Sequence, residues 1–153
     1  MIQLADDVFA SRTDPNQLSV DEKIIERLKR IHPATVSEFN DGTGPAAWIL
    51  VFPTTLDLMK MFIESKITEK GLFDLTPLNS SYEALYLCSA MVFQEYRGKG
   101  IAKKLTIQAV ESIKKDHPIK SLFVWAFSKE GNSLAENVSH LTRLPLKKRL
   151  ELN

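Results

Sequence analysis

The sequence predicts an α/β protein, of the mixed α+β kind, with a central mixed sheet and flanking helices. Two runs, 85–93 and 119–127, are apolar at nearly every position, which is typical of strands buried on both faces of a sheet. An amphipathic segment from about 100 to 115 lies between them. A strand, a helix and a strand of these lengths form a right-handed crossover, so the two strands are predicted to be parallel neighbours.

The N-terminal half is predicted to contain two helices and one strand. Its elements in order are a helix over 19–31, a turn over 40–45, a strand over 46–52, a helix over 55–70 and a loop over 72–81. Ser19 and Glu22 have the spacing of a capping box at the first helix. Pro53 is expected to end the strand and Gly71 to end the second helix.

The C-terminal part continues the same alternation. A last helix is expected over about 133–142, before Pro145, and 146–152 can close the sheet as an edge strand. At 153 residues, with 44% hydrophobic and 25% charged residues, residues 1–153 are most simply one globular domain.

The net charge of +1 conceals an asymmetry along the chain. From Arg97 onward there are 12 Lys and Arg against 5 Asp and Glu, whereas the part before it has 8 against 14. A basic C-terminal part suits an anionic partner that carries several phosphates. The alternative, a solvated face of surface lysines, stays open. Nucleic acid is not expected as a partner, because no basic run is interleaved with aromatic residues.

Cys88 is the single cysteine, which excludes an intramolecular disulfide and a cysteine-rich metal site. We therefore expect no metal and a reducing, cytoplasmic location. No basic leader and no apolar run of about 20 residues is present, so no membrane span is expected. Cys88 itself is expected to be a buried thiol of the core, because nothing in the sequence marks it as activated.

The run from Gln94 to Ala102 joins the first apolar strand to the amphipathic helix and indicates an anion-binding turn. Gly98 and Gly100 allow a tight turn, and Arg97 and Lys99 add positive charge. The free N–H groups of the first helical turn point at a group that sits above this turn. A P-loop is disfavoured because the Gly-Lys-Ser/Thr ending is missing, and a dinucleotide fingerprint because Lys103 replaces its third glycine.

The hexapeptide from Arg97 to Ala102 resembles motif A of the GNAT superfamily of N-acetyltransferases, Arg/Gln-x-x-Gly-x-Gly/Ala, at every fixed position. The resemblance extends over about 84–153 and implies a GNAT-like sheet with splayed central strands. It also implies that acetyl-CoA is the acyl donor and that an amine on a small molecule, a peptide or a protein is the acceptor. The residues expected to bind acetyl-CoA are Ala90, Met91, Val92, Arg97, Gly98, Lys99, Gly100, Ile101, Ala102 and Asn132.

Asn132 and Ala135 match a second family pattern, Asn-x-x-Ala, at the helix after the next strand. In the family a tyrosine that commonly protonates the departing thiolate follows in this helix, but Ser139 stands in its place here. His140 is the substitute that chemistry suggests, and both are weak candidates for the catalytic acid.

No general base can be assigned from the sequence. The polar residues of the central strand are Tyr86, Cys88 and Ser89, none of which is acidic, so Tyr86 is a weak catalytic candidate. The family usually has a hairpin before this strand, whereas the sequence here predicts a single strand, so the acceptor cannot be identified.

Three interpretations follow. The first is an acetyl-CoA-dependent N-acetyltransferase that works by direct attack of a primary amine. The second is a module of the same fold that binds CoA without catalysis. The third is an unrelated α/β domain with a chance Gly-x-Gly turn. The oligomeric state is left open, a homodimer included.

Overall fold

The computed structural model describes residues 22–42, 44–96, 98–125 and 129–149. It is a mixed α/β fold in which these residues form five α-helices and one open sheet of five strands. The helices are α2 (Glu22–Ile31), α3 (Leu56–Ile63), α4 (Glu69–Leu75), α5 (Ile101–Asp116) and α6 (Lys129–Thr142). The strands are β1 (Val36–Asn40), β2 (Pro45–Thr54), β3 (Ala84–Val92), β4 (Ser121–Trp125) and β5 (Leu146–Arg149). Two short 3₁₀ turns lie at Pro33–Thr35 and Gln94–Tyr96.

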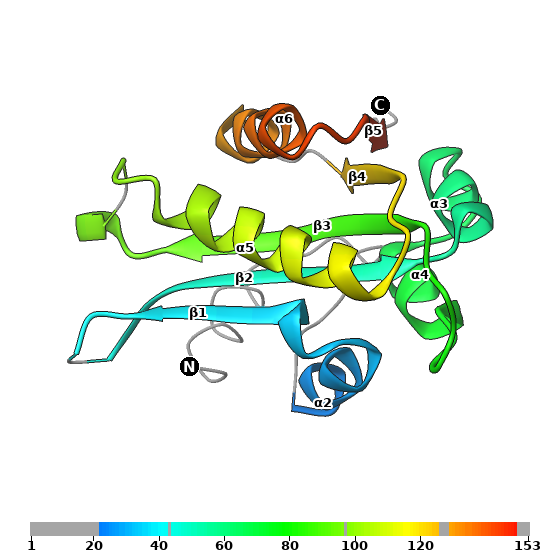
Figure 1. Cartoon of the computed structure of the whole chain (residues 1–153), viewed down its shortest axis with the longest axis horizontal. Helices are drawn as coiled ribbons and strands as arrows, with labels where there is room; N and C mark the ends of the chain where they lie inside the picture. The colour runs from blue at the N-terminus through cyan, green and yellow to red at the C-terminus, as the bar shows by residue number, and fades with distance from the viewer. Residues whose placement is uncertain (1–21, 43, 97, 126–128, 150–153) are drawn as a thin grey trace.

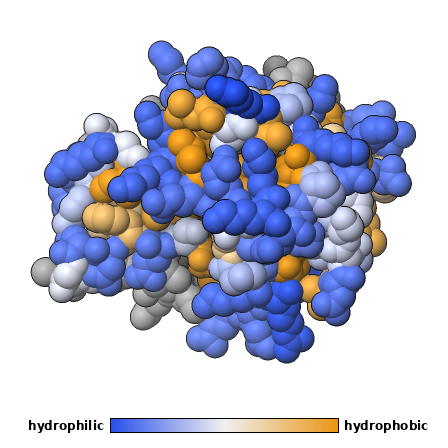
Figure 2. Space-filling view, in the orientation of Figure 1, coloured by the Kyte–Doolittle hydropathy of each residue, from blue (hydrophilic) through white to orange (hydrophobic). Residues whose placement is uncertain are grey.

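The strands lie side by side in their order along the chain, β1-β2-β3-β4-β5. The first three are antiparallel, and β3, β4 and β5 are parallel. In Figure 1, α5 lies in front of the sheet, α2 below it, α6 above it, and α3 with α4 at its right-hand end. Figure 2 shows that hydrophilic side chains dominate the face over α5.

The predicted parallel pairing of the two strands is confirmed. Leu85 pairs with Leu122 in parallel register, and α5 connects the two strands. The helix buries Ala109, Val110 and Ile113, one apolar stripe at helical spacing. The strand predicted over 119–127 begins later, at Ser121, and its positions 126 and 127 lie outside the described residues.

The N-terminal half differs from prediction because it contains a hairpin. Val36–Asn40 pairs with β2, and the predicted turn follows, where the Asn40 side chain accepts from Gly42 N at 2.8 Å. The strand also does not end at Pro53, which pairs with Leu85. Its missing N–H is tolerated because β1 reaches only as far as Leu50, so one edge of β2 is unpaired there.

The single helix predicted over 55–70 is wrong, since the structure has two. Thr55 caps α3 by accepting from Leu58 N at 3.2 Å. The chain then turns at Ser65, whose φ is +61°, and Thr68 caps a new helix by accepting from Gly71 N at 2.9 Å. Gly71 therefore lies inside α4, which also occupies the first positions of the predicted loop 72–81.

The two C-terminal elements are found with shifted bounds. α6 begins at Lys129, four residues before the predicted start at Ser133, and β5 pairs in parallel with β4 over Leu146–Arg149. Ser19 of the predicted capping box and residues 150–152 of the predicted edge strand lie outside the described residues.

Candidate functional site

The turn between β3 and α5 is built on two glycines with left-handed backbone. Gly98 has φ +81° and Gly100 has φ +76°, a region that other residues enter at a steric cost. A Cβ at either position would meet no protein atom within 4 Å. The backbone path therefore favours glycine at both positions, and the space beside both residues is open. Arg97, which the sequence also predicted to contribute to this turn, lies outside the described residues.

Among the described residues, the first turn of α5 contains neither an acid nor a side-chain cap to balance its positive end. Gly100 is the N-cap and makes no side-chain capping bond, and the first turn contains no acidic residue. The side chains of Ile101 and Ala102 are half-buried, while Lys99 and Lys103 are exposed. Free N–H groups and the helix dipole favour an anion at such an end. Cations placed there are unfavourable unless an anion joins them.

The β1–β2 hairpin contacts the loop that leads from β3 to α5. The Tyr96 hydroxyl donates to an Asp41 carboxylate oxygen, and the Tyr96 ring contacts Phe39 edge-on. The hydrogen bond to Asp41 is the largest cause that raises the pKa of Tyr96 above its usual range. The Lys99 ammonium lies 5.4 Å from the centre of the Tyr96 ring. These contacts connect the β1–β2 turn to the glycine turn.

Beyond Leu87, β3 leaves β4 and keeps β2 as its ladder partner. The β3–β4 ladder ends at Leu87 and Val124, whereas the β2–β3 ladder continues to Val92. Phe93 N donates to Ala46 O at 3.0 Å, and amides alternate in direction along an antiparallel strand. The amide of Ala90 therefore points away from β2, toward the side on which β4 diverges. The predicted positions Ala90, Met91 and Val92 all lie in this divergent part of β3.

Asn132 lies near the same end of the sheet, in the first turn of α6, which follows the carboxyl end of β4. Its Oδ1 is buried without a hydrogen-bond partner among the described residues, as is the Ser89 Oγ on β3. Carboxyl ends of parallel strands meet at one edge of a sheet, where ligands of α/β proteins commonly bind. The structure thus places Asn132 at the same edge as the glycine turn, with buried polar atoms that a ligand could satisfy.

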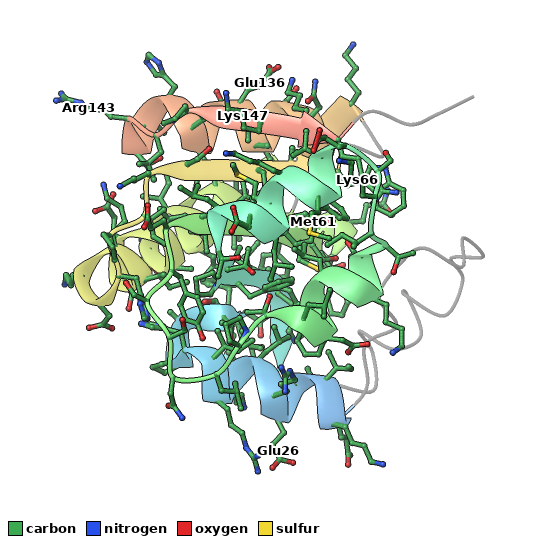
Figure 3. The ribbon with its side chains drawn as sticks, turned by 90° about the vertical axis from the view of Figure 1, so that its right-hand side faces the viewer. Glu26, Met61, Lys66, Glu136, Arg143 and Lys147 are labelled. Atoms are coloured by element: carbon green, nitrogen blue, oxygen red, sulfur yellow. The ribbon has the colours of Figure 1, made fainter. Side chains whose placement is uncertain are left out.

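Ser139 and His140 lie at the opposite end of these strands. The Ser139 hydroxyl donates to Leu144 O at 2.5 Å, and Pro145 O accepts from Leu122 N at the start of β4. Both residues line an open hollow at the end of α6, from which Arg143 projects in Figure 3. The start of β4 pairs with the start of β3, so roughly 20 Å of strand separates them from the glycine turn. The structure does not bring these two acid candidates together with the predicted acetyl-CoA residues.

A buried carboxylate that the sequence did not single out lies behind the central strand. Glu69, the first residue of α4, is 2% exposed, and the Tyr86 hydroxyl donates to its Oε2 at 2.5 Å. The Cys88 Sγ lies 4.0 Å from the same oxygen. Burial is the largest cause that raises the pKa of Tyr86 well above its usual range, followed by the charge of Glu69. One feature of the sequence could have indicated this burial. Glu69 lies three and four residues before Leu72 and Phe73, so it falls on the apolar stripe of the helix.

Cys88 lies at a β-bulge. Leu50 pairs with Ser89 and Val51 with Leu87, so Cys88 is the extra residue opposite this step. Its side chain is half-buried and contacts the Glu69 carboxylate, whereas the sequence predicted a thiol buried in an apolar core.

Arg149 closes the side of the core that contains Glu69. Its guanidinium carbon lies 4.6 Å from the centre of the Phe62 ring and 4.5 Å from that of Trp125. Its Nη1 donates to Ile67 O at 2.9 Å, two residues before Glu69. The last strand therefore fixes the segment between α3 and α4.

Neither a metal centre nor a membrane helix is visible in the part of the chain that the structure covers. No three His, Cys, Asp or Glu side chains among residues 22–42, 44–96, 98–125 and 129–149 are grouped as metal ligands. Within the same ranges, no helix has both the length and the apolar character needed to cross a bilayer.

The search against known protein families finds no match to this chain. The search of curated proteins also finds none.

Proposed function

We propose that the chain is an acetyl-CoA-dependent N-acetyltransferase of the GNAT kind, which moves the acetyl group to a primary amine by direct attack. The observation that carries this proposal is the glycine turn before α5. It combines two left-handed glycines, an uncapped helix start without acids, and exposed lysines. A pyrophosphate seated on the first amides of α5 would balance this positive charge.

The divergent part of β3 supports the placement of the thioester. The Ala90 amide points toward the side that β4 has left, so it can donate to the thioester carbonyl and to the negative charge that develops on its oxygen. The pantetheine arm would then run between β3 and β4, toward the buried orphan atoms of Ser89 and Asn132. The hairpin before the central strand also agrees with the pattern that the family usually has.

Loss of the family tyrosine is compatible with catalysis. A thiol with a pKa of about 8.5 is a tolerable leaving group near neutral pH. A positioned acid contributes about 10²- to 10⁴-fold, whereas orientation of the amine against the thioester contributes more. The side chains of this chain would therefore mainly hold and orient the two substrates.

The second candidate is a CoA-binding module without catalysis. One observation favours it, namely the position of Ser139 and His140 at the end of the strands away from the glycine turn. At this position neither residue can protonate a thiolate that departs near the glycine turn.

Thermal denaturation with three ligands tests the proposal. Acetyl-CoA and CoA should raise the melting temperature in proportion to occupancy, and pantetheine, which lacks the phosphates, should do so far less. The charge reversal Lys103→Glu at the start of α5 should weaken the shift, whereas Lys115→Glu near the end of the same helix should not. Equal shifts with CoA and pantetheine would refute the anion site, and CoA binding without thiol release from acetyl-CoA for any amine would favour the second candidate.

A further inference from the structure

Glu69 is an acid buried in an apolar core, which is an unfavourable place for an ionisable side chain. It is hydrogen-bonded to Tyr86, whose ring packs against Phe52 and Phe62, and burying a carboxylate is costly unless donors reach it. Tyr86 supplies one donor at 2.5 Å. An apolar residue would fill this place at lower cost, so a role in proton chemistry or in binding of a cation accounts better for an acid here.

The side chains of Glu69, Tyr86 and Cys88 form a series that runs from the core toward the surface. Glu69 and Tyr86 are 2% and 1% exposed, whereas Cys88 is half-buried and Ala90, two residues further along β3, is exposed. The Cys88 Sγ is 4.0 Å from Glu69 Oε2. Ala90 is roughly 7 Å from Cys88 at the usual rise of a strand. The thiol therefore lies between the buried carboxylate and the divergent part of β3.

The surrounding charges favour Glu69 as the proton acceptor. Tyr86 keeps its proton, because burial and Glu69 raise its pKa well above the usual range. The opposing effect comes from Arg149, which lowers the pKa of Tyr86 and is the cation that faces this cluster from β5. Tyr86 can therefore donate to Glu69 and orient it but cannot act as the base.

We propose that Cys88 and Glu69 form the acceptor end of the site, where the thiol contacts the amine and Glu69 receives its proton through that thiol. This inference rests on the proposed acyl transfer and supplies its missing base. The amine nitrogen attacks the thioester carbon, its proton passes to Cys88 Sγ, and the Cys88 proton passes to Glu69 Oε2. The carbon–sulfur bond of acetyl-CoA breaks, CoA leaves as a thiolate that solvent protonates, and Glu69 then returns its proton to solvent.

Alkylation of Cys88 tests the acceptor end without any need for turnover. Cys88 is the single cysteine, so the rate of carbamidomethylation by iodoacetamide reports on this thiol alone. Glu69→Gln removes a negative charge 4.0 Å from Sγ, so the thiol should ionise at lower pH and react about tenfold faster at pH 7. Propylamine should slow alkylation of the parent, and tetramethylammonium, which has no N–H, should not. Propylamine should also fail to protect Glu69→Gln.

Glu83→Gln is the matched control, because Glu83 precedes β3 and its carboxylate pairs with Lys120 at 3.0 Å on the surface. It should alter neither the pH profile nor the protection. Failure of propylamine to protect the parent overturns the inference, even if Glu69→Gln does not fold. The same follows if the parent and a folded Glu69→Gln share one pH profile of alkylation.

Acetyl transfer separates this inference from the proposed function. Glu69→Gln should lower kcat about 10²-fold or more and flatten the pH profile, with acetyl-CoA affinity unchanged and with partial rescue in Glu69→Asp. Full activity in Glu69→Gln would overturn the relay and leave the acyltransferase standing. Protection of Cys88 by propylamine without any acetyl transfer would refute the acyltransferase and leave the amine site standing.

Discussion

The imidazole of His32 joins the end of α2 to the end of α5. Its Nε2 lies 2.6 Å from Asp116 Oδ2, and its Nδ1 accepts from Ala34 N at 3.0 Å. Because Nδ1 accepts, the ring proton lies on Nε2 and is donated to Asp116. The His32 ring is 4% exposed, whereas the Asp116 side chain is 62% exposed, so the bond connects a buried ring to a surface carboxylate.

Removal of the Asp116 carboxylate should therefore destabilise the fold. Asp116→Ala leaves a buried N–H donor without its partner, at a cost of about 1–3 kcal/mol in the free energy of unfolding. Glu26→Ala is the matched control, since it breaks an exposed ion pair with Arg30 on α2 and should cost less than about 0.5 kcal/mol. Urea denaturation measures both, and equal effects would contradict a structural role for the buried bond.

Stability should fall as the pH is lowered through the range of His117. Burial and the neighbouring His32 lower the pKa of His117 below 6.5, although Asp116 opposes this. The unfolded chain then binds more protons at and below about pH 6.5, so acid favours unfolding down to the lowered pKa of the folded state. His117→Gln should flatten the dependence of the urea midpoint between pH 5 and pH 7.5. An unchanged slope in this variant would assign the acid sensitivity to other groups.

Two substitutions of Gly100 should separate backbone strain from ligand binding. Gly100→Ala forces an L side chain to φ +76° and should cost about 1–2 kcal/mol in stability. Gly100→Asn should recover part of this loss, because asparagine tolerates left-handed backbone. Both should weaken CoA binding, since each places a side chain in the open space of the turn. Denaturation and CoA titration give the two readouts, and parent-like CoA affinity in Gly100→Asn would contradict the placement of the pyrophosphate.

The hydroxyl of Tyr86 should contribute more to stability than that of Tyr82. Tyr86→Phe removes a donor to a buried carboxylate, for a loss of about 2–3 kcal/mol. Tyr82→Phe removes a bond to the backbone oxygen of Pro77, for about 1 kcal/mol. Chemical denaturation compares them, and the reverse order would mean that Glu69 does not depend on Tyr86. In an alkaline absorbance titration, Tyr86 should ionise well above the usual range, a shift that burial causes first.

The central part of the fold could be predicted because its local and tertiary signals agree. β3 and β4 are buried at their paired positions, so their apolar runs were unambiguous. β1 was missed because it has only β2 as a neighbour and none of its five residues is fully buried. The break between α3 and α4 was missed because it depends on Ser65, and nothing local marks a serine for φ +61°.

Some residues of the candidate site could likewise be predicted from the sequence, and others could not. Gly98 and Gly100 could be found because a backbone requirement leaves glycine in the sequence. Glu69 could not be placed, since it is 17 residues from Tyr86 along the chain and reaches it only when α4 packs on the sheet. Ser139 was aligned with a family residue, but its hydroxyl binds Leu144 O at the end of α6.

The hydrogen bond from Arg149 to Ile67 O can form only late in the synthesis of the chain. The ribosome releases the chain from its N-terminus, so the glycine turn and α5 emerge well before β5. Until Arg149 is available, nothing from β5 covers Phe62 and Trp125 or holds the carbonyl two residues before Glu69. A nascent chain would therefore complete the glycine turn before α5 first and fix its buried acid last.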